Sequence, residues 1–352
     1  MVRLDLPSVL QDGRVAPEHY AELLAGYLAQ DTAATDCLIF VFKERVHPEP
    51  AGAASEVDPI SGPDKDLVEA LQVVLERQDL PLREAWLVDC GHLWHVDCPD
   101  PDACPPHGGS VSRSEVSAVN ATFIVEGSVV QSGPEAAQLP EPNEQPSLAL
   151  TAALERGAAR VDDPAYVADW MLRWERVLDG AAGGRLQDRA CAELVELIAG
   201  LDQVCLRDAL LTSAAFTLHR AVSGGEYIRA LPRGTASIVG CSPSDASGVL
   251  YVSAMLADTV RPPDWDRLDR LREACVDLLP QAAGSAASAL QCLAAWVDWC
   301  RGRGSWAGAV VDQCRTRDPH YSMAELLEQL LNQGHLAGWA AREDIAWRRR
   351  RS

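Results

Sequence analysis

Six residues of the kinds that bind metals or carry out thiol chemistry cluster between positions 89 and 109. They are three cysteines and three histidines: Cys90, His92, His95, Cys98, Cys104 and His107. Thiolates and imidazoles are the ligands that zinc takes in structural sites, and neighbouring thiols can form a redox pair. The cluster therefore raises three alternatives, which are a zinc site, a thiol switch and a stiff turn whose cysteines only pack.

The spacing of the cluster counts against zinc. Cys98 and Cys104 have five residues between them, whereas zinc knuckles usually place two to four residues between their cysteines. Residues 92–97 alternate as a strand does, so His92 and His95 point to opposite faces and are poorly placed to share a metal. We expect no cofactor. Zinc stays the lesser alternative, with four candidate ligands: Cys90, His95, Cys98 and Cys104.

The loop that follows is acidic and rich in proline. Aspartates flank Cys98 and should raise the pKa of its thiol, which counts against a redox switch. Prolines fix the backbone angles around Cys104, and two glycines at 108 and 109 let the chain leave the loop. We therefore predict a rigid exposed loop that serves as a recognition surface or a fold staple. Its residues are Asp97, Cys98, Asp100, Pro101, Cys104, Pro105 and Pro106.

Elements of an α/β domain surround this loop. Residues 37–42 (CLIFVF) form a continuous apolar run, which is typical of a strand covered on both faces. Residues 84–89 and 92–97 have the pattern of two strands joined by a tight turn at Cys90-Gly91. Stripes of apolar residues predict three helices, over 17–30, 64–79 and 112–127. The alternation of strands and helices predicts a mixed, partly parallel sheet with helices over residues 1–130.

A Pro-rich stretch separates this domain from a helical one. Residues 131–147 hold four prolines and few apolar groups, as linkers do. Residues 148–352 have helical spacing almost throughout, which predicts an all-α bundle domain. Asp163-Pro164 begins one helix, and further helices are expected near 204–222 and 336–350. The segment 234–257 fits either a loop with a helix or a β-hairpin.

The negative charge lies mainly in the first part of the chain. Residues 1–145 contain 25 acidic and 8 basic residues, and the whole chain has a formal charge of −20. Such a surface repels phosphates and anionic lipids, so we expect no membrane contact and no nucleic-acid binding apart from the tail Arg348–Arg351. The eleven cysteines are odd in number and scattered, and we see no secretion signal at the start of the sequence. We therefore expect a cytoplasmic protein with mostly reduced thiols.

Two stretches resemble a known family. Residues 97–109 (DCPDPDACPPHGG) match a C-x-D-P-x-C-C-P-P-x-G signature except at Ala103, where a second cysteine is usual. Residues 292–327 (CLAAWVDWCRGRGSWAGAVVDQCRTRDPHYSMAELL) match the same family's C-terminal segment. The chain thus resembles the actinobacterial family known as domain of unknown function 4192. The resemblance implies the two-domain layout and no particular activity.

The C-terminal stretch also resembles a tetratricopeptide-type helical hairpin, over about residues 286–333. Gly302, Ala307 and Asp318-Pro319 stand at the spacing of a turn, a close helix crossing and a helix stop. Only one copy is evident, so an ordinary helix pair at the end of the bundle is the competing interpretation.

The function we predict is protein–protein binding or regulation without catalysis. The common phosphate-binding, nucleophile-elbow and zinc-protease motifs do not occur in the sequence. The expected partner is another protein, held by a helical surface that includes Trp299, Trp306, Asp318 and Tyr321. One alternative is an enzyme or ligand-binding protein with its site at the strand ends near 42–46 and 97–107, beside the Cys98–Cys104 loop. The second alternative is a zinc- or thiol-dependent sensor.

Overall fold

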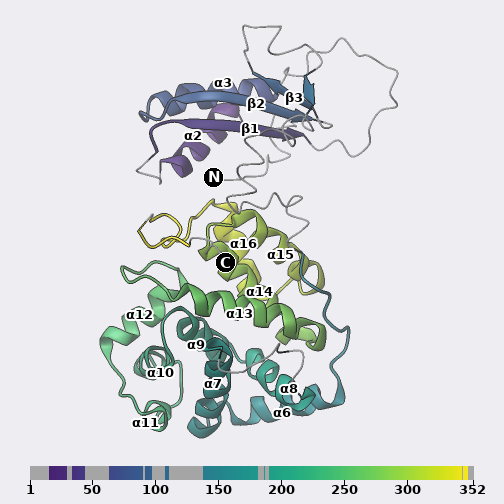
Figure 1. Ribbon diagram of the computed structural model, residues 1–352, viewed down its shortest axis with the longest axis vertical. Coiled ribbons are helices and arrows are strands. Elements are labelled where there is room, and N and C mark those ends of the chain that lie inside the picture. Colours follow the sequence, from purple (N-terminus) through teal and green to yellow (C-terminus); the bar gives the residue numbers. More distant parts are fainter. Residues whose placement is uncertain are drawn as a thin grey trace. The chain divides into compact units, whose positions relative to one another are not determined.

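A computed structural model describes residues 16–29, 34–43, 63–89, 92–96, 108–110, 138–180, 186, 190–342 and 344–347. These described residues form thirteen α-helices and one four-stranded mixed sheet near the N-terminus (Figure 1). The chain divides into two compact units, residues 1–131 and 132–350. The expectation of strands with helices first and helices alone afterwards is confirmed at this level. Among the described residues, every helix is too short or too polar to span a lipid bilayer.

The sheet of the first unit has the strand order β1-β2-β3-β4. Strands β1 (Cys37–Lys43) and β2 (Leu82–Asp89) are parallel because helix α3 (Pro63–Glu76) carries the chain back between them. Strand β3 (His92–His95) pairs antiparallel with β2, and β4 (Gly109–Ser110) pairs antiparallel with β3. The predicted parallel pairing and the predicted β2–β3 hairpin are both confirmed. The turn of that hairpin, Cys90-Gly91, lies outside the described residues.

One face of this sheet is covered by helices. Helix α2 (Pro17–Leu28) and helix α3 share a buried cluster with the side chains of Cys37 and Ile39. Leu38, Phe40 and Phe42 alternate with that covered set and are exposed. The prediction that CLIFVF is covered on both faces therefore fails for the described residues, in which β1 is an edge strand with one covered face.

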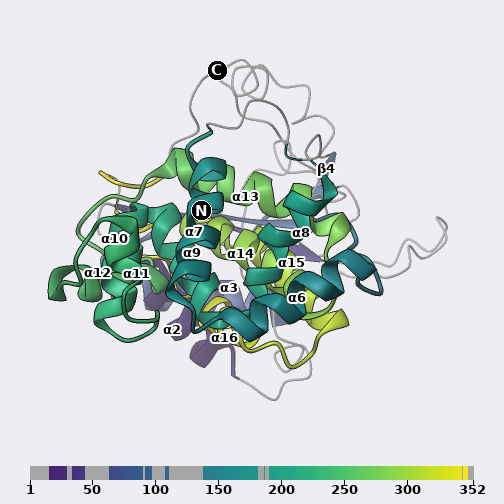
Figure 2. The ribbon, with the colours of Figure 1, turned by 90° about the horizontal axis from the view of Figure 1, so that it is seen from below.

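The helical unit is built around helix α14 (Gly284–Cys300). All of its residues from Ala286 to Cys300 are buried, and its three buried polar residues, Ser288, Gln291 and Asp298, are paired with neighbouring polar side chains. Figure 2 shows α14 near the middle of the unit. The helices around it are α6 (Leu148–Arg160), α7 (Pro164–Leu178), α8 (Cys191–Ala199), α9 (Val204–Ala215), α10 (Leu218–Tyr227), α11 (Thr235–Val239), α12 (Asp245–Met255), α13 (Trp265–Leu278), α15 (Gly304–Arg317) and α16 (Ser322–Asn332).

Capping residues set several helix starts. The Asp163 side chain accepts a hydrogen bond from the Ala165 N–H at 2.9 Å, and Pro164 occupies the first turn of α7, as the sequence predicted. The helix expected near 204–222 is interrupted at Phe216, where φ is −131° and ψ is −87°. Thr217 then caps α10 by accepting a hydrogen bond from the Arg220 N–H at 3.3 Å.

The structure decides between the two alternatives for residues 234–257 and differs from the prediction for residues 336–350. Residues 234–257 contain the two helices α11 and α12, so the β-hairpin alternative is wrong. The helix expected over 336–350 is absent from the described residues 336–342 and 344–347, which form turns. Gly338 lies so close to Asp258 that a Cβ there would be 2.8 Å from its carboxylate, and the Trp339 N–H donates to the Ala257 carbonyl at 2.9 Å, outside the segment.

The described end of the Pro-rich stretch lies against the helical unit. Gln313 on α15 pairs with the backbone of Leu139 through two hydrogen bonds, of 3.1 Å and 2.9 Å. The Asn143 N–H donates to the carbonyl of Ala282 at 2.9 Å. Residues 138–147 of the expected linker 131–147 are therefore bound to the bundle that follows them.

Candidate functional site

The described part of the predicted thiol cluster comprises two histidines. His92 lies beside Trp94 with ring centroids 5.8 Å apart, and His95 meets the edge of Trp86 on β2 at 4.7 Å. The two histidines therefore point to opposite faces, as strand alternation predicted. The Nδ1 atom of His95 is buried without a hydrogen-bond partner among the described residues. Within the same residues, no three metal-binding side chains come together.

The remaining residues of the predicted loop lie outside the described residues. They are Cys90, Asp97, Cys98, Asp100, Pro101, Cys104, Pro105, Pro106 and His107. The rival enzyme site at the strand ends falls in the same part of the chain, except for Phe42 and Lys43 at the end of β1.

Of the four residues of the predicted helical surface, Trp299 is buried, and Trp306, Asp318 and Tyr321 are partly buried. Trp299 is only 2% exposed, and its Nε1 donates to the carbonyl of His335 at 2.7 Å, so it belongs to the core. The hydroxyl of Tyr321 accepts a 2.9 Å hydrogen bond from Arg207, and burial raises the pKa of Tyr321 to about 12 although Arg207 opposes the shift. Asp318 accepts a 3.0 Å bond from Ser288. These contacts hold the α15–α16 turn to α9 and α14.

Trp306, the fourth residue of the predicted helical surface, is partly buried and contacts an arginine side chain. The guanidinium of Arg303 lies 5.2 Å from the centre of the Trp306 ring and 4.7 Å from that of Trp347. Arg301 stacks on the same Trp347 at 5.1 Å while its side chain pairs with the buried Asp298. The stack is tied into the core through this ion pair, and it joins the α14–α15 turn to the C-terminal segment.

Two buried cysteines face each other across the α14–α15 pair. The Sγ atoms of Cys292 and Cys314 are 3.9 Å apart, and both side chains are fully buried. Burial raises the pKa of Cys292, whereas the hydrogen bond from Cys292 lowers the pKa of Cys314. Solvent does not reach either thiol, so the pair is a packing contact in this state. The sequence predicted cysteines of this buried kind without identifying the pair.

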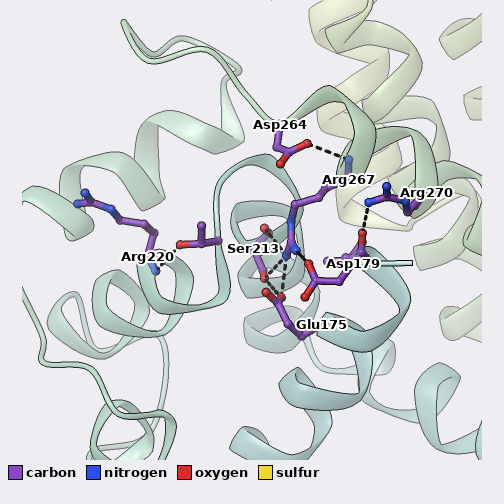
Figure 3. Close-up of polar contacts among 9 residues, drawn as sticks. Glu175, Asp179, Ser213, Arg220, Asp264, Arg267 and Arg270 are labelled. Atoms are coloured by element: carbon purple, nitrogen blue, oxygen red, sulfur yellow. Dashed lines mark hydrogen bonds and ion pairs between the residues drawn. The ribbon is translucent and has the colours of Figure 1, made fainter. Parts of the chain in front are cut away.

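Figure 3 shows a buried ionic cluster that joins α7, α9 and α13. Arg267 donates to Glu175 at 2.7 Å, to the carbonyl of Ser213 at 3.1 Å, and to Asp179. Asp264 caps the start of α13 by accepting from the Arg267 N–H at 3.2 Å. Arg267 pairs with Glu175 and Asp179 through its terminal nitrogens, while its Nε atom is buried without a hydrogen-bond partner among the described residues. The cluster therefore holds three helices together.

The strongest candidate for a binding surface lies on α10 and α12. A shallow hollow of about 350 Å³ is lined by apolar side chains of these two helices, with Asp245 at its edge. The exposed apolar residues that line it are Tyr227 (48% exposed), Ile228 (38%), Val249 (60%) and Val252 (53%), and Leu256 (55%) lies four residues beyond Val252. We call these five residues the α10–α12 surface. Single exposed apolar residues are ordinary, but a contiguous group is typical of a binding site.

Close packing of α10 on α12 creates this surface. A Cβ on Gly248 would lie 2.7 Å from the Tyr227 ring, and one on Gly224 would lie 2.8 Å from the Ser247 carbonyl carbon. The two glycines therefore let the helices approach closely and bring Tyr227 beside the exposed stripe of α12. A hydrogen bond to Asp245 raises the pKa of Tyr227 and orients its ring.

A second hollow, of about 520 Å³, lies between α2 and α3. Its charged lining is mainly acidic and consists of Glu18, Glu22, Asp66, Glu69 and Arg77. The hollow shows where part of the negative charge of the first 145 residues is placed. Its electrostatics favour cationic over anionic groups.

Taken together, these features define a protein with a small α/β unit and a larger helical unit, whose most distinctive described surface is apolar and open. The chain belongs to the family described as Domain of unknown function (DUF4192), whose model matches residues 1–233 and 252–336. The family resemblance of the two quoted stretches is thereby confirmed. Comparison with curated proteins and with solved structures gave no match. The family match omits residues 234–251, which form α11 and the first half of α12.

Proposed function

We propose that this protein acts by binding another protein through the α10–α12 surface. The observation that carries the proposal is the exposure of five apolar side chains, from Tyr227 to Leu256, on two adjoining helices. Burying such a group against a partner removes apolar area from water, which is the main driving force for association. A surface of this kind suits a protein partner better than a small ligand, because it is open and almost uncharged.

The helical hairpin of α14 and α15 has a supporting role in this proposal. Ala307 is fully buried at the crossing and Gly302 makes the turn with φ at +75°, as a tetratricopeptide-like hairpin requires. We propose that this single hairpin is a framework for the bundle. We also propose that the protein is actinobacterial and is located in the cytoplasm. The eight described cysteines are all free thiols, which supports a reducing compartment.

A pull-down with a matched control tests this function. The tagged full chain, Val252→Asp and Leu326→Asp would each be used to capture proteins from the host lysate, with mass spectrometry of the retained proteins. Leu326 is an exposed leucine on α16 and provides the control for an added surface charge. We expect a near-stoichiometric partner with the wild type and Leu326→Asp, and its loss with Val252→Asp. Equal retention by Val252→Asp, or loss with Leu326→Asp alone, would overturn the assignment to α10–α12.

A zinc- or thiol-dependent sensor is the second candidate, and one observation favours it. Among the described residues, Nδ1 of His95 is buried without a hydrogen-bond partner, and a buried nitrogen of this kind is costly unless another group binds it. Zinc analysis of protein purified without added metal tests this candidate. Close to one equivalent in the wild type and a loss in His95→Gln would support it, and well under one equivalent in the wild type would exclude it.

A further inference from the structure

We infer that the partner of the α10–α12 surface is a second copy of this chain, with α12 packed antiparallel against α12 of the other copy. The inference rests on the proposed function and names its partner. Such a contact is isologous, because each copy presents the same surface to the other around a two-fold axis. Three features of the surface favour a second copy as the partner: the apolar residues on both sides of α12, the charges at the ends of α12, and the apolar area of the surface.

Helix α12 has apolar residues on two opposite sides. Gly248, Tyr251 and Ala254 are buried on the inner side against α9 and α10. Val249, Val252 and Leu256 form an outer stripe at spacings of three and four residues and are all more than half exposed. A helix that is apolar all round is typical of a fully buried position. The outer stripe has the spacing with which two helices pack along a common seam.

The charges at the two ends of α12 favour an antiparallel pair. Asp245 stands at the start of the outer stripe, about 16 Å along the axis from Leu256. Arg261 is exposed just beyond the other end, whereas the carboxylate of Asp258 lies against Gly338. An antiparallel second copy brings Asp245 toward Arg261 of its mate, while a parallel copy would bring the two Asp245 carboxylates together. No other charged side chain lies on the outer stripe of α12.

The area of the surface suits a dimer of ordinary size. With usual side-chain areas, the five exposed fractions amount to about 450 Å² of apolar surface per copy. Standard interfaces bury about 800 Å² per partner, of which somewhat more than half is apolar. The α10–α12 surface therefore supplies the apolar centre of such an interface.

Mass measurement across a range of concentrations tests the dimer. Size-exclusion chromatography with light scattering would compare wild type, Val252→Asp and the control Leu326→Asp from about 1 to 200 µM. We expect wild type and Leu326→Asp to reach twice the 38.0 kDa of one chain. Val252→Asp should raise the dissociation constant at least about 100-fold, because each dimer would bury two unpaired charges. Val249→Asp gives a second test should Val252→Asp fail to show the wild-type circular dichroism spectrum.

A charge exchange tests the antiparallel arrangement. Arg261→Asp should weaken the dimer about tenfold, since two rim pairs are lost per dimer, and adding Asp245→Arg should restore most of the affinity. A wild type that stays monomeric at 200 µM, or a Val252→Asp variant that dimerises like wild type, would overturn the inference. In that case the pull-down still decides the proposed function, because a heterologous partner lost by Val252→Asp would support it without any dimer.

Discussion

Arg267 offers the sharpest test of how the helical unit is held together. In the cluster of Figure 3 it is the one cation shared by Glu175 on α7, Asp179 at the end of α7 and the Ser213 carbonyl on α9. Replacing it with methionine keeps most of the buried volume and removes the charge. Glu175 then loses its cation and keeps the 3.2 Å hydrogen bond from the Ser213 hydroxyl, and the Ser213 carbonyl loses its Arg267 donor.

The expected cost follows from the exposure of the groups left behind. Breaking a buried ion pair by removing one partner usually costs about 3–5 kcal/mol. The Asp179 side chain is 52% exposed and can be rehydrated, and that of Glu175 is 20% exposed, so solvent screening lowers the figure. We expect Arg267→Met to lower the free energy of unfolding by about 2–3 kcal/mol. For a unit of this size the melting temperature should fall by about 4–10 °C.

Urea unfolding followed by tryptophan fluorescence measures this change. Arg176→Met on the same helix α7 is the control, because Arg176 is exposed and its replacement should change stability by less than about 0.5 kcal/mol. Glu175→Gln combined with Arg267→Met should cost at least about 1 kcal/mol less than the sum of the single changes, since the two residues share one interaction. Additive effects, or an Arg267→Met variant as stable as the control, would refute the claim that this ion pair secures α7 to α13.

Three further outcomes follow from particular contacts. Gly224→Ala should lower the free energy of unfolding by about 1–2 kcal/mol in a denaturant titration, because its Cβ would meet the Ser247 backbone, and an unchanged midpoint would contradict the close α10–α12 packing. Tyr321→Phe should cost about 1–2 kcal/mol in the same assay because Arg207 loses an acceptor, and a neutral result would mean that the α15–α16 turn is held in another way. Hydrogen bonds from Arg160 and, to a lesser extent, from the Ala165 N–H lower the pKa of Asp163 in the folded protein. The ionised Asp163 therefore stabilises the fold above the pKa of an unfolded aspartate, which is near 3.9. This stabilisation is lost as the pH falls through the folded pKa of Asp163. Wild type should therefore melt above Asp163→Ala at pH 6 and at nearly the same temperature at pH 2, whereas a constant difference would show that the carboxylate charge is unimportant.

The spacing of apolar residues was sufficient to predict those helices and strands that bury one face. The stripe of Tyr166, Trp170 and Trp174 on α7 and the cap at Asp163 follow directly from spacing and residue type. The parallel β1–β2 pair follows in the same way, from two strands separated by a helix. These predictions needed only local sequence.

Long-range packing decided the features that spacing left open. The outer stripe of α12 has the same residue types as its buried stripe, so the sequence of 234–257 gave no sign of which valines are exposed. Trp299 was placed on the predicted helical surface, whereas all residues of α14 from Ala286 to Cys300 are buried. The turns of residues 336–342 depend on the contact of Gly338 with Asp258, which lie far apart in the chain.

Hydrogen–deuterium exchange at two protein concentrations shows where a second copy binds, and it needs no substitution. Raising the wild-type concentration from about 1 to 200 µM should slow exchange in peptides covering 218–228 and 245–256, with little change in peptides covering α16 at 322–332. Concentration-dependent protection confined to any other part of the chain, or none in α10 and α12, would contradict the assignment of this surface as the site where a second chain binds.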